Sequence, residues 1–110
     1  MEANSPNIKS LSEADYRSSI QERQRAVVLF TAPWCGMCKR LKPLFAAKSV
    51  EFPAIDFFTV DIGQFPDLRK EANVTSLPFF ATYKEGVLQA HQATNKPDVF
   101  INLLKSLLDD

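Results

Sequence analysis

The sequence has little with which to bind metals, nucleic acids or membranes. Two cysteines and one histidine, His91, fall short of the four ligands that a structural zinc site needs. Thirteen basic residues balance thirteen acidic ones, so no net field draws the chain to nucleic acid or to an anionic membrane. No apolar run approaches the roughly 20 residues of a membrane-spanning helix. These absences indicate an ordinary soluble globular protein that binds neither nucleic acid nor membrane.

The beginning of the chain also lacks an export signal. Met1 to Asn7 is polar, without the apolar centre of a signal peptide. Two cysteines do not make a disulfide scaffold, so we expect a reducing, cytoplasmic location. The length of 110 residues suits a single core. We therefore expect a flexible extension over residues 1–6, one domain over residues 7–110, and a monomer.

Both cysteines stand in Trp34-Cys35-Gly36-Met37-Cys38, directly after the hydrophobic run 26–30. The run indicates a buried strand, and the residues after it follow a helical pattern. The cysteines would then lie in the first turn of a helix, where backbone N–H groups and partial positive charge favour the Cys35 thiolate. A bridge that closes so short a loop adds little stability. This arrangement predicts thiol–disulfide exchange.

The remaining pattern predicts alternating strands and helices. Pro43 lies inside the second helix and predicts a kink there, although the helix could also end near Lys42. The first helix could begin at a Ser10–Glu13 capping box or at Ser12. Helices between strands imply parallel pairing, and a closing hairpin adds antiparallel strands to a mixed sheet. We expect strands over 7–11, 26–32, 55–61, 77–83 and 87–92, and helices over 12–24, 35–48, 67–72 and 97–108.

The chain resembles the thioredoxin family over residues 7–108. Three features carry this resemblance: Trp-Cys-Gly-x-Cys-Lys at residues 34–39, a helix proline at Pro43, and a strand-opening proline at Leu77-Pro78 with a glycine hairpin after it. The resemblance implies an α/β thioredoxin fold, with a central mixed sheet of about five strands flanked by about four helices. It also implies a protein disulfide oxidoreductase.

The resemblance assigns roles to seven residues. It implies that Cys35 is the nucleophile and Cys38 the resolving thiol, and that Leu77-Pro78 is a cis peptide bond facing them. The backbone of Leu77 would pair with an extended substrate segment. The substrate-binding residues implied in this way are Trp34, Gly36, Met37, Leu77 and Pro78.

The resemblance also implies the partners. These are disulfide-containing proteins and an electron donor such as a thioredoxin reductase or a glutathione system, and no cofactor is needed beyond the Cys35–Cys38 disulfide. Alternatives remain open at this point: a disulfide oxidase or isomerase, or a binding module with weak redox turnover. The cysteines could also be an inert pair, or two chains could pool them around zinc or an iron–sulfur cluster.

Four positions depart from the family pattern. Leu29 stands where thioredoxins usually bury an aspartate, and we align Phe57 with the usual neighbouring lysine. Phe79 and Met37 replace a threonine and a proline. Since losing both members of an ion pair costs less than losing one, the sequence indicates a dry site in which Cys38 is deprotonated slowly.

Other polar residues suggest solvent-exposed surface. Lys39, Arg40 and Lys42 indicate a solvated helix face, although they could also favour the Cys35 thiolate or attract an acidic partner. His91 is expected on the surface of a strand.

Overall fold

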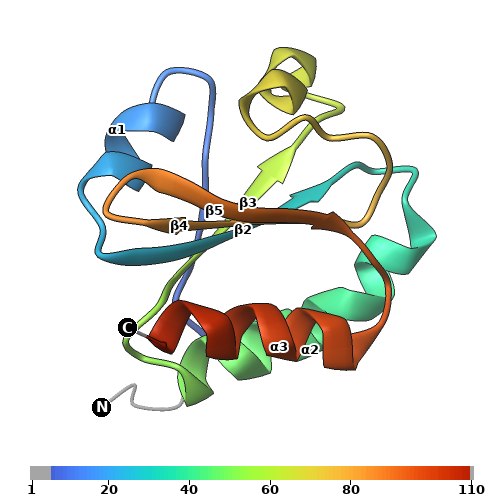
Figure 1. Ribbon diagram of the computed structural model, residues 1–110. Helices are drawn as coiled ribbons and strands as arrows, with labels where there is room; N and C mark the ends of the chain where they lie inside the picture. Colours follow the sequence, from blue (N-terminus) through green and yellow to red (C-terminus); the bar gives the residue numbers. More distant parts are fainter. Residues whose placement is uncertain (1–5, 110) are drawn as a thin grey trace.

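A five-stranded mixed sheet runs through the middle of the protein, with helices on both faces (Figure 1). The computed structural model describes residues 6–109, so residues 1–5 of the predicted extension, and Asp110, lie outside the described residues. The elements follow in the order β1 (Ile8–Ser10), α1 (Tyr16–Gln21), β2 (Arg25–Thr31), α2 (Gly36–Glu51), β3 (Asp56–Asp61), the 3-10 helix η1 (Pro66–Glu71), β4 (Phe79–Lys84), β5 (Val87–Ala93) and α3 (Pro97–Leu108). The predicted fold class is confirmed.

The strand order in the sheet is β1-β3-β2-β4-β5. Strands β1 and β2 pair with β3 in parallel, whereas β4 is antiparallel to both β2 and β5. The expectation of parallel pairing across every helix is therefore wrong at η1. The 3-10 helix has six residues and rises only about 12 Å, whereas the six-residue strand β3 is about 20 Å long. Helix η1 therefore does not carry the chain back along the sheet, and β4 begins at the end at which β3 finished.

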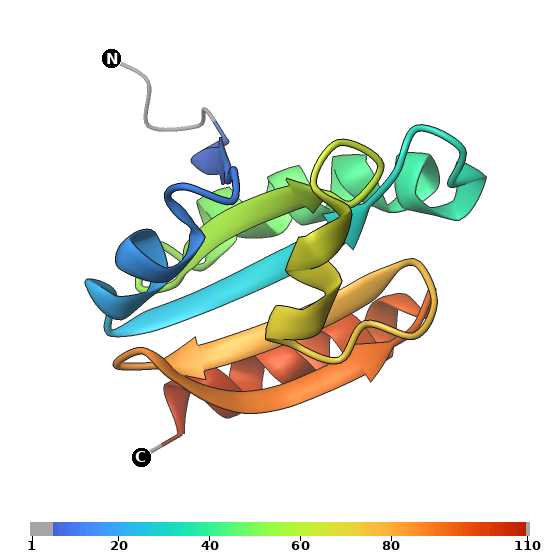
Figure 2. The ribbon, with the colours of Figure 1, turned by 90° about the horizontal axis from the view of Figure 1, so that it is seen from above.

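The two faces of the sheet build two separate cores. Residues of β2 alternate between them, with Val28 and Phe30 facing α1 and η1 while Val27 and Leu29 face α2 and α3. All four side chains are fully buried, as the uninterrupted apolar run predicts for a central strand. Figure 2 shows α1 and η1 on the near face of the sheet and α2 and α3 behind it.

Helix α1 is shorter than the sequence pattern predicts, and the Ser10–Glu13 capping box does not start it. Instead, the carboxylate of Asp15 accepts hydrogen bonds from the backbone N–H of Ser12 at 2.6 Å and from its hydroxyl at 3.0 Å. This turn delays the helix to Tyr16. Tyr16 and Ile20 are each 2% exposed, so the short helix is held by its buried face.

Helix α2 continues past Pro43 to Glu51, so the alternative end near Lys42 is wrong. Its first residue is Gly36, and Cys35 is its N-cap. In α3, Phe100, Leu104 and Leu107 are buried, Leu103 is half-buried, and Leu108 at the end of the helix is 40% exposed.

The predicted glycine hairpin is present, and a second turn follows η1. Asn73 has a φ of 56° after η1, and Glu85 and Gly86 have φ values of 49° and 82° in the β4–β5 hairpin.

Candidate active site

Cys35 and Cys38 form a disulfide at the amino end of α2, with their Cα atoms 5.3 Å apart. As N-cap, Cys35 has an extended backbone, and its Sγ accepts a hydrogen bond from the backbone N–H of Cys38 at 3.1 Å. The Cys35 N–H donates to the carbonyl of Ala32 at 3.0 Å, which fixes the turn between β2 and α2. Cys35 is 8% exposed and Cys38 only 1%, so Cys35 is the sulfur nearer to solvent.

The Leu77–Pro78 peptide bond, immediately before β4, is cis. The carbonyl of Pro78 accepts a hydrogen bond from the Thr94 N–H at 3.1 Å. Within the described part of the chain, the backbone N–H and C=O of Leu77 make no hydrogen bond. An exposed backbone strip without partners can pair with an extended segment of another chain.

A groove of about 440 Å³ joins these two segments. The loops before α2 and before β4 lie at the same end of the sheet in both ribbon views (Figures 1 and 2). Five of the seven site residues predicted from the resemblance line the groove, whereas Cys38 and Pro78 do not. The lining residues are Trp34, Cys35, Gly36, Met37, Ile62, Arg69, Val74, Thr75, Ser76 and Leu77.

Two large side chains stand out from the surface beside Cys35. Trp34 is 72% exposed and Met37 is 49% exposed. Asn95, in the loop between β5 and α3, donates a hydrogen bond from Nδ2 to the Met37 thioether at 3.2 Å. A Cβ added at Gly63 would lie 2.9 Å from Pro33 Cδ and 2.9 Å from Trp34 Cζ3. Gly63 therefore allows the loop that carries Trp34 to pack close to the end of β3.

Leu29 is fully buried in the apolar cluster between the sheet and helices α2 and α3. The alignment of Phe57 as its neighbour on β3 needs correction. The strand register places Thr59 opposite Leu29, while Phe57 lies opposite Val27. Counting from the sequence missed the register by two residues, which keeps the side chain on the same face of a strand.

Other candidate residues lie on the surface. Lys39, Arg40 and Lys42 are exposed along α2, and His91 is exposed on β5 with its ring 6.1 Å from that of Phe79. Over residues 6–109, no group of three or more histidine, cysteine or acidic side chains is placed to hold a metal ion. Within the same range, no helix has the length and apolar character needed to cross a membrane.

Sequence reasoning missed seven residues of this site. Gly63 supports the Trp34 loop and Asn95 holds Met37, while the other five line the groove: Ile62, Arg69, Val74, Thr75 and Ser76. None of them stands in a motif near the cysteines, and the fold alone brings them there.

A Cys-x-x-Cys disulfide at a helix N-terminus, whose first cysteine shares a groove with the residue before a cis-proline, is the arrangement of the thiol–disulfide oxidoreductase class. The sequence profile of the family described as Thioredoxin matches residues 7–106. The chain belongs to the thioredoxin family.

Individual relatives agree with this. The chain is 35% identical over 75 residues to Thioredoxin 1 of Plasmodium falciparum, covering 68% of this chain and 72% of that protein. It is 34% identical over 74 residues to mitochondrial Thioredoxin-3 of Saccharomyces cerevisiae, covering 67% of this chain and 58% of the relative, which is less than two thirds. A solved structure of Plasmodium falciparum thioredoxin superposes with a TM-score of 0.85 at 28% identity, over 89% of this chain and 97% of that one. These likenesses and the cysteine pair support thiol–disulfide oxidoreductase activity.

Proposed function

We propose that this protein reduces disulfides in other proteins, with Cys35 as the nucleophile and Cys38 as the resolving thiol. The observation that carries the proposal is the unequal setting of the two sulfurs. Cys35 caps α2, lines the groove and accepts the Cys38 N–H, whereas Cys38 is buried. In the reduced protein, a hydrogen bond from a backbone N–H and the helix N-terminus both favour a thiolate at Cys35.

The reaction consists of two exchanges. The Cys35 thiolate attacks one sulfur of the substrate disulfide, so that a mixed disulfide forms and the other substrate sulfur leaves as a thiolate. Cys38 then loses its proton and attacks Cys35 Sγ, which releases the second substrate thiolate and leaves the Cys35–Cys38 disulfide. Two electrons pass to the substrate, and an electron donor, such as a thioredoxin reductase or a glutathione system, returns two electrons and restores the Cys35–Cys38 dithiol.

The groove would orient the substrate for this attack. An extended substrate segment pairs with the unpartnered backbone of Leu77, as a short added strand. The exposed surfaces of Trp34 and Met37 border the segment beside Cys35. Gly36, without a side chain, leaves room next to the reacting sulfur.

The second exchange would be the slow one. The family's usual aspartate near the resolving thiol is replaced here by Leu29, which cannot accept a proton and which lies in an apolar cluster. We expect the mixed disulfide to persist longer than in thioredoxins that carry the acid.

The setting of the protein is part of the same proposal. Residues 7–110 act as one monomeric domain in a reducing compartment, the cytoplasm by the argument from cysteine usage. One relative is named as mitochondrial, so that compartment is the other candidate.

Trapping tests the proposal directly. Cys38→Ser should stall at the mixed disulfide with a disulfide-linked test peptide, giving a covalent adduct that dithiothreitol releases. Cys35→Ser, the matched control, should form no adduct and show no turnover. Turnover in Cys35→Ser, or an adduct on Cys38 alone, would overturn the assignment of roles. A failure of the wild type to reduce any disulfide peptide would overturn the function itself.

A further inference from the structure

The groove beside Cys35 carries a single charged side chain. Of its ten lining residues, nine are apolar or neutral and one, Arg69, is a cation. Arg69 comes from η1, a segment that the motif around the cysteines does not include. Because the same groove also holds Cys35 and Leu77, a segment that pairs with Leu77 lies in a groove lined by a positively charged side chain.

The acidic residues of η1 do not neutralise this charge. Glu71 is turned toward α1, where its carboxylate accepts from the Arg17 guanidinium at 3.2 and 3.3 Å. For residues 6–109, no carboxylate lies within ion-pair distance of the Arg69 guanidinium. The exposed Arg69 side chain therefore lines the groove with N–H donors that are hydrated and not engaged by a carboxylate of the described residues.

The backbone of Arg69 is held in place. Its carbonyl accepts a hydrogen bond from the Val74 N–H at 3.0 Å, and Leu68 beside it is 5% exposed in the core. Asn73, with its positive φ, makes the turn between η1 and residues 74–77. Arg69 and Leu77 therefore line the same groove from the two sides of this turn.

Resting on the proposed function, we infer that Arg69 makes this protein select substrates with an aspartate or glutamate close to the attacked cysteine. A guanidinium binds a carboxylate through two parallel hydrogen bonds, which adds geometric selection to the charge. Lysine and arginine at the same substrate positions are repelled, since the groove has no acid to receive them.

The distance from the reacting cysteine limits where the acid can stand. An extended segment advances about 3.3 Å per residue, and alternate side chains face the same wall. The groove therefore places the selected carboxylate within about three residues of the attacked cysteine.

The experiment compares disulfide-linked peptides that differ at one flanking position, with Glu, Gln or Lys. The quantity measured is the ratio of kcat/KM for the Glu and Gln peptides, with dithiothreitol as donor. We expect wild type to favour Glu by about two- to fivefold at low ionic strength, the range of an exposed ion pair. Raising the salt to about 0.5 M should shrink this ratio, because the Debye length falls toward about 3–5 Å.

Variants assign the preference to Arg69. Arg69→Gln should remove it, and Arg69→Glu should invert it in favour of Lys, which a merely structural effect would not do. Lys70→Gln is the matched control, since Lys70 is exposed on the same helix and does not line the groove, and it should keep the wild-type ratio.

Two results would overturn the inference. One is equal reduction of the Glu and Gln peptides by wild type, and the other is an unchanged ratio in Arg69→Gln. Either leaves the proposed function intact as long as the Gln peptide is reduced. If wild type reduces neither peptide, the proposed function itself has failed.

Discussion

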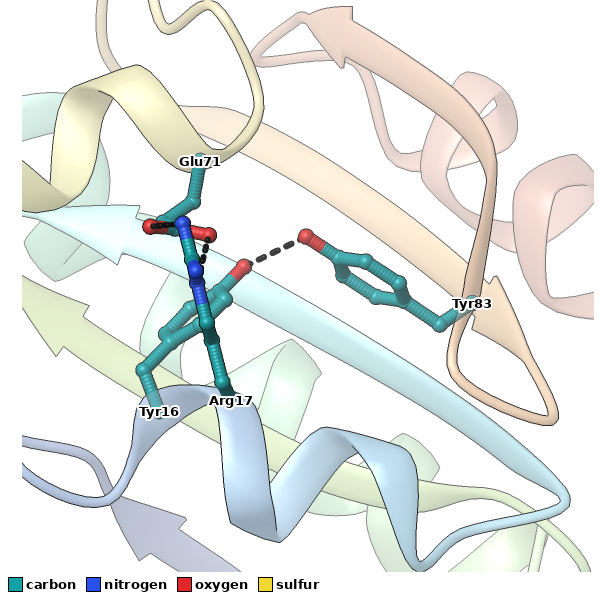
Figure 3. A network of polar contacts seen from close by, with 4 residues as sticks. All are labelled: Tyr16, Arg17, Glu71 and Tyr83. Atoms are coloured by element: carbon teal, nitrogen blue, oxygen red, sulfur yellow. Dashed lines mark hydrogen bonds and ion pairs between the residues drawn. The ribbon is translucent and has the colours of Figure 1, made fainter.

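The two faces of the sheet differ in the ionisable groups within their buried clusters. On the face covered by α1 and η1, the hydroxyls of Tyr16 and Tyr83 meet at 2.6 Å inside an otherwise apolar core (Figure 3). The face covered by α2 and α3 has a cluster without an ionisable group, built around Phe45, Phe57, Phe80 and Phe100. The ring centroids in this cluster lie 4.6–6.3 Å apart, in stacked, tilted and edge-to-face pairs.

The difference lies in the buried phenol hydroxyls, which occur as a pair on one face and are absent from the apolar cluster of the other. Each tyrosine hydroxyl satisfies the other, and the Arg17–Glu71 ion pair lies beside them (Figure 3). Burial raises the pKa of Tyr16 and of Tyr83, and the Glu71 carboxylate adds to the effect on both. On the other face, where the family usually places an acid, Leu29 has no polar partner and needs none. The comparison predicts that an ionisable group placed inside either apolar cluster destabilises the protein unless a partner is placed with it.

Of the variants considered, Leu29→Asp should lower the free energy of unfolding most. A carboxylate at a fully buried position without a partner costs about 3–5 kcal/mol of unfolding free energy. Burial raises the expected pKa of the new carboxyl, so the folded protein holds the proton that the unfolded chain loses above about pH 4. The stability deficit against wild type should therefore grow as pH rises from about 4 to 8. Urea unfolding at several pH values measures it.

The same variant tests the slow step of the proposed mechanism. If deprotonation of Cys38 limits turnover, Leu29→Asp should shorten the life of the mixed disulfide at neutral pH. Leu29→Asn is the control, since it is polar and of similar size but cannot take a proton. A gain in both variants, or in neither, would show that another group or water already removes the proton.

Tyr83→Phe should have the second largest effect. It removes one hydroxyl and leaves that of Tyr16 buried without a partner, which costs about 1–3 kcal/mol. The double variant with Tyr16→Phe should lose less than the sum of the two single variants, since both polar groups are then gone. Urea unfolding of the three variants closes the cycle. Additive losses would show that the two hydroxyls do not support each other.

The sequence predicts the parts of the fold that depend on neighbouring residues, and it does not predict contacts between residues that are far apart along the chain. Local signals were sufficient for β2, for α3 and for the Glu85–Gly86 hairpin, because periodicity and turn chemistry are written in neighbouring residues. The Cys35–Cys38 site was predicted for the same reason. Tyr16 and Tyr83 are 67 residues apart, and nothing near either one indicates the other.

The same distinction holds for the residues of the candidate site. The resemblance identified the residues within motifs, including the cysteines and Leu77-Pro78. It could not identify Arg69 or Asn95, which reach the site from other elements through the topology of the sheet. The length of α1 was missed because the Ser12–Asp15 turn competes with the helix for its first residues.

Alkaline titration should show a smaller effect of the tyrosine pair. The protein has only two tyrosines, so tyrosinate absorbance reports this pair alone. With both pKa values raised in the fold, the unfolded chain ionises first, near about pH 10. The stability that the pair contributes is therefore complete below about pH 10 and is lost as pH rises further. If tyrosinate appears near pH 10 while the circular dichroism stays that of the folded protein, the two tyrosines are not buried as a hydrogen-bonded pair.

Arg17→Gln should have the smallest effect. The Arg17 side chain is 79% exposed and that of Glu71 is 23% exposed, so water and salt screen the ion pair even though two N–H groups donate to the carboxylate. We expect the urea midpoint at physiological salt to stay within error of wild type, and the loss caused by Tyr83→Phe to be the same with or without Arg17. A midpoint shift as large as that of Tyr83→Phe would mean that the polar face depends on its surface ion pair. In that case the face covered by α1 and η1 would be stabilised more by the Arg17–Glu71 ion pair on the surface than by the buried tyrosine hydroxyls.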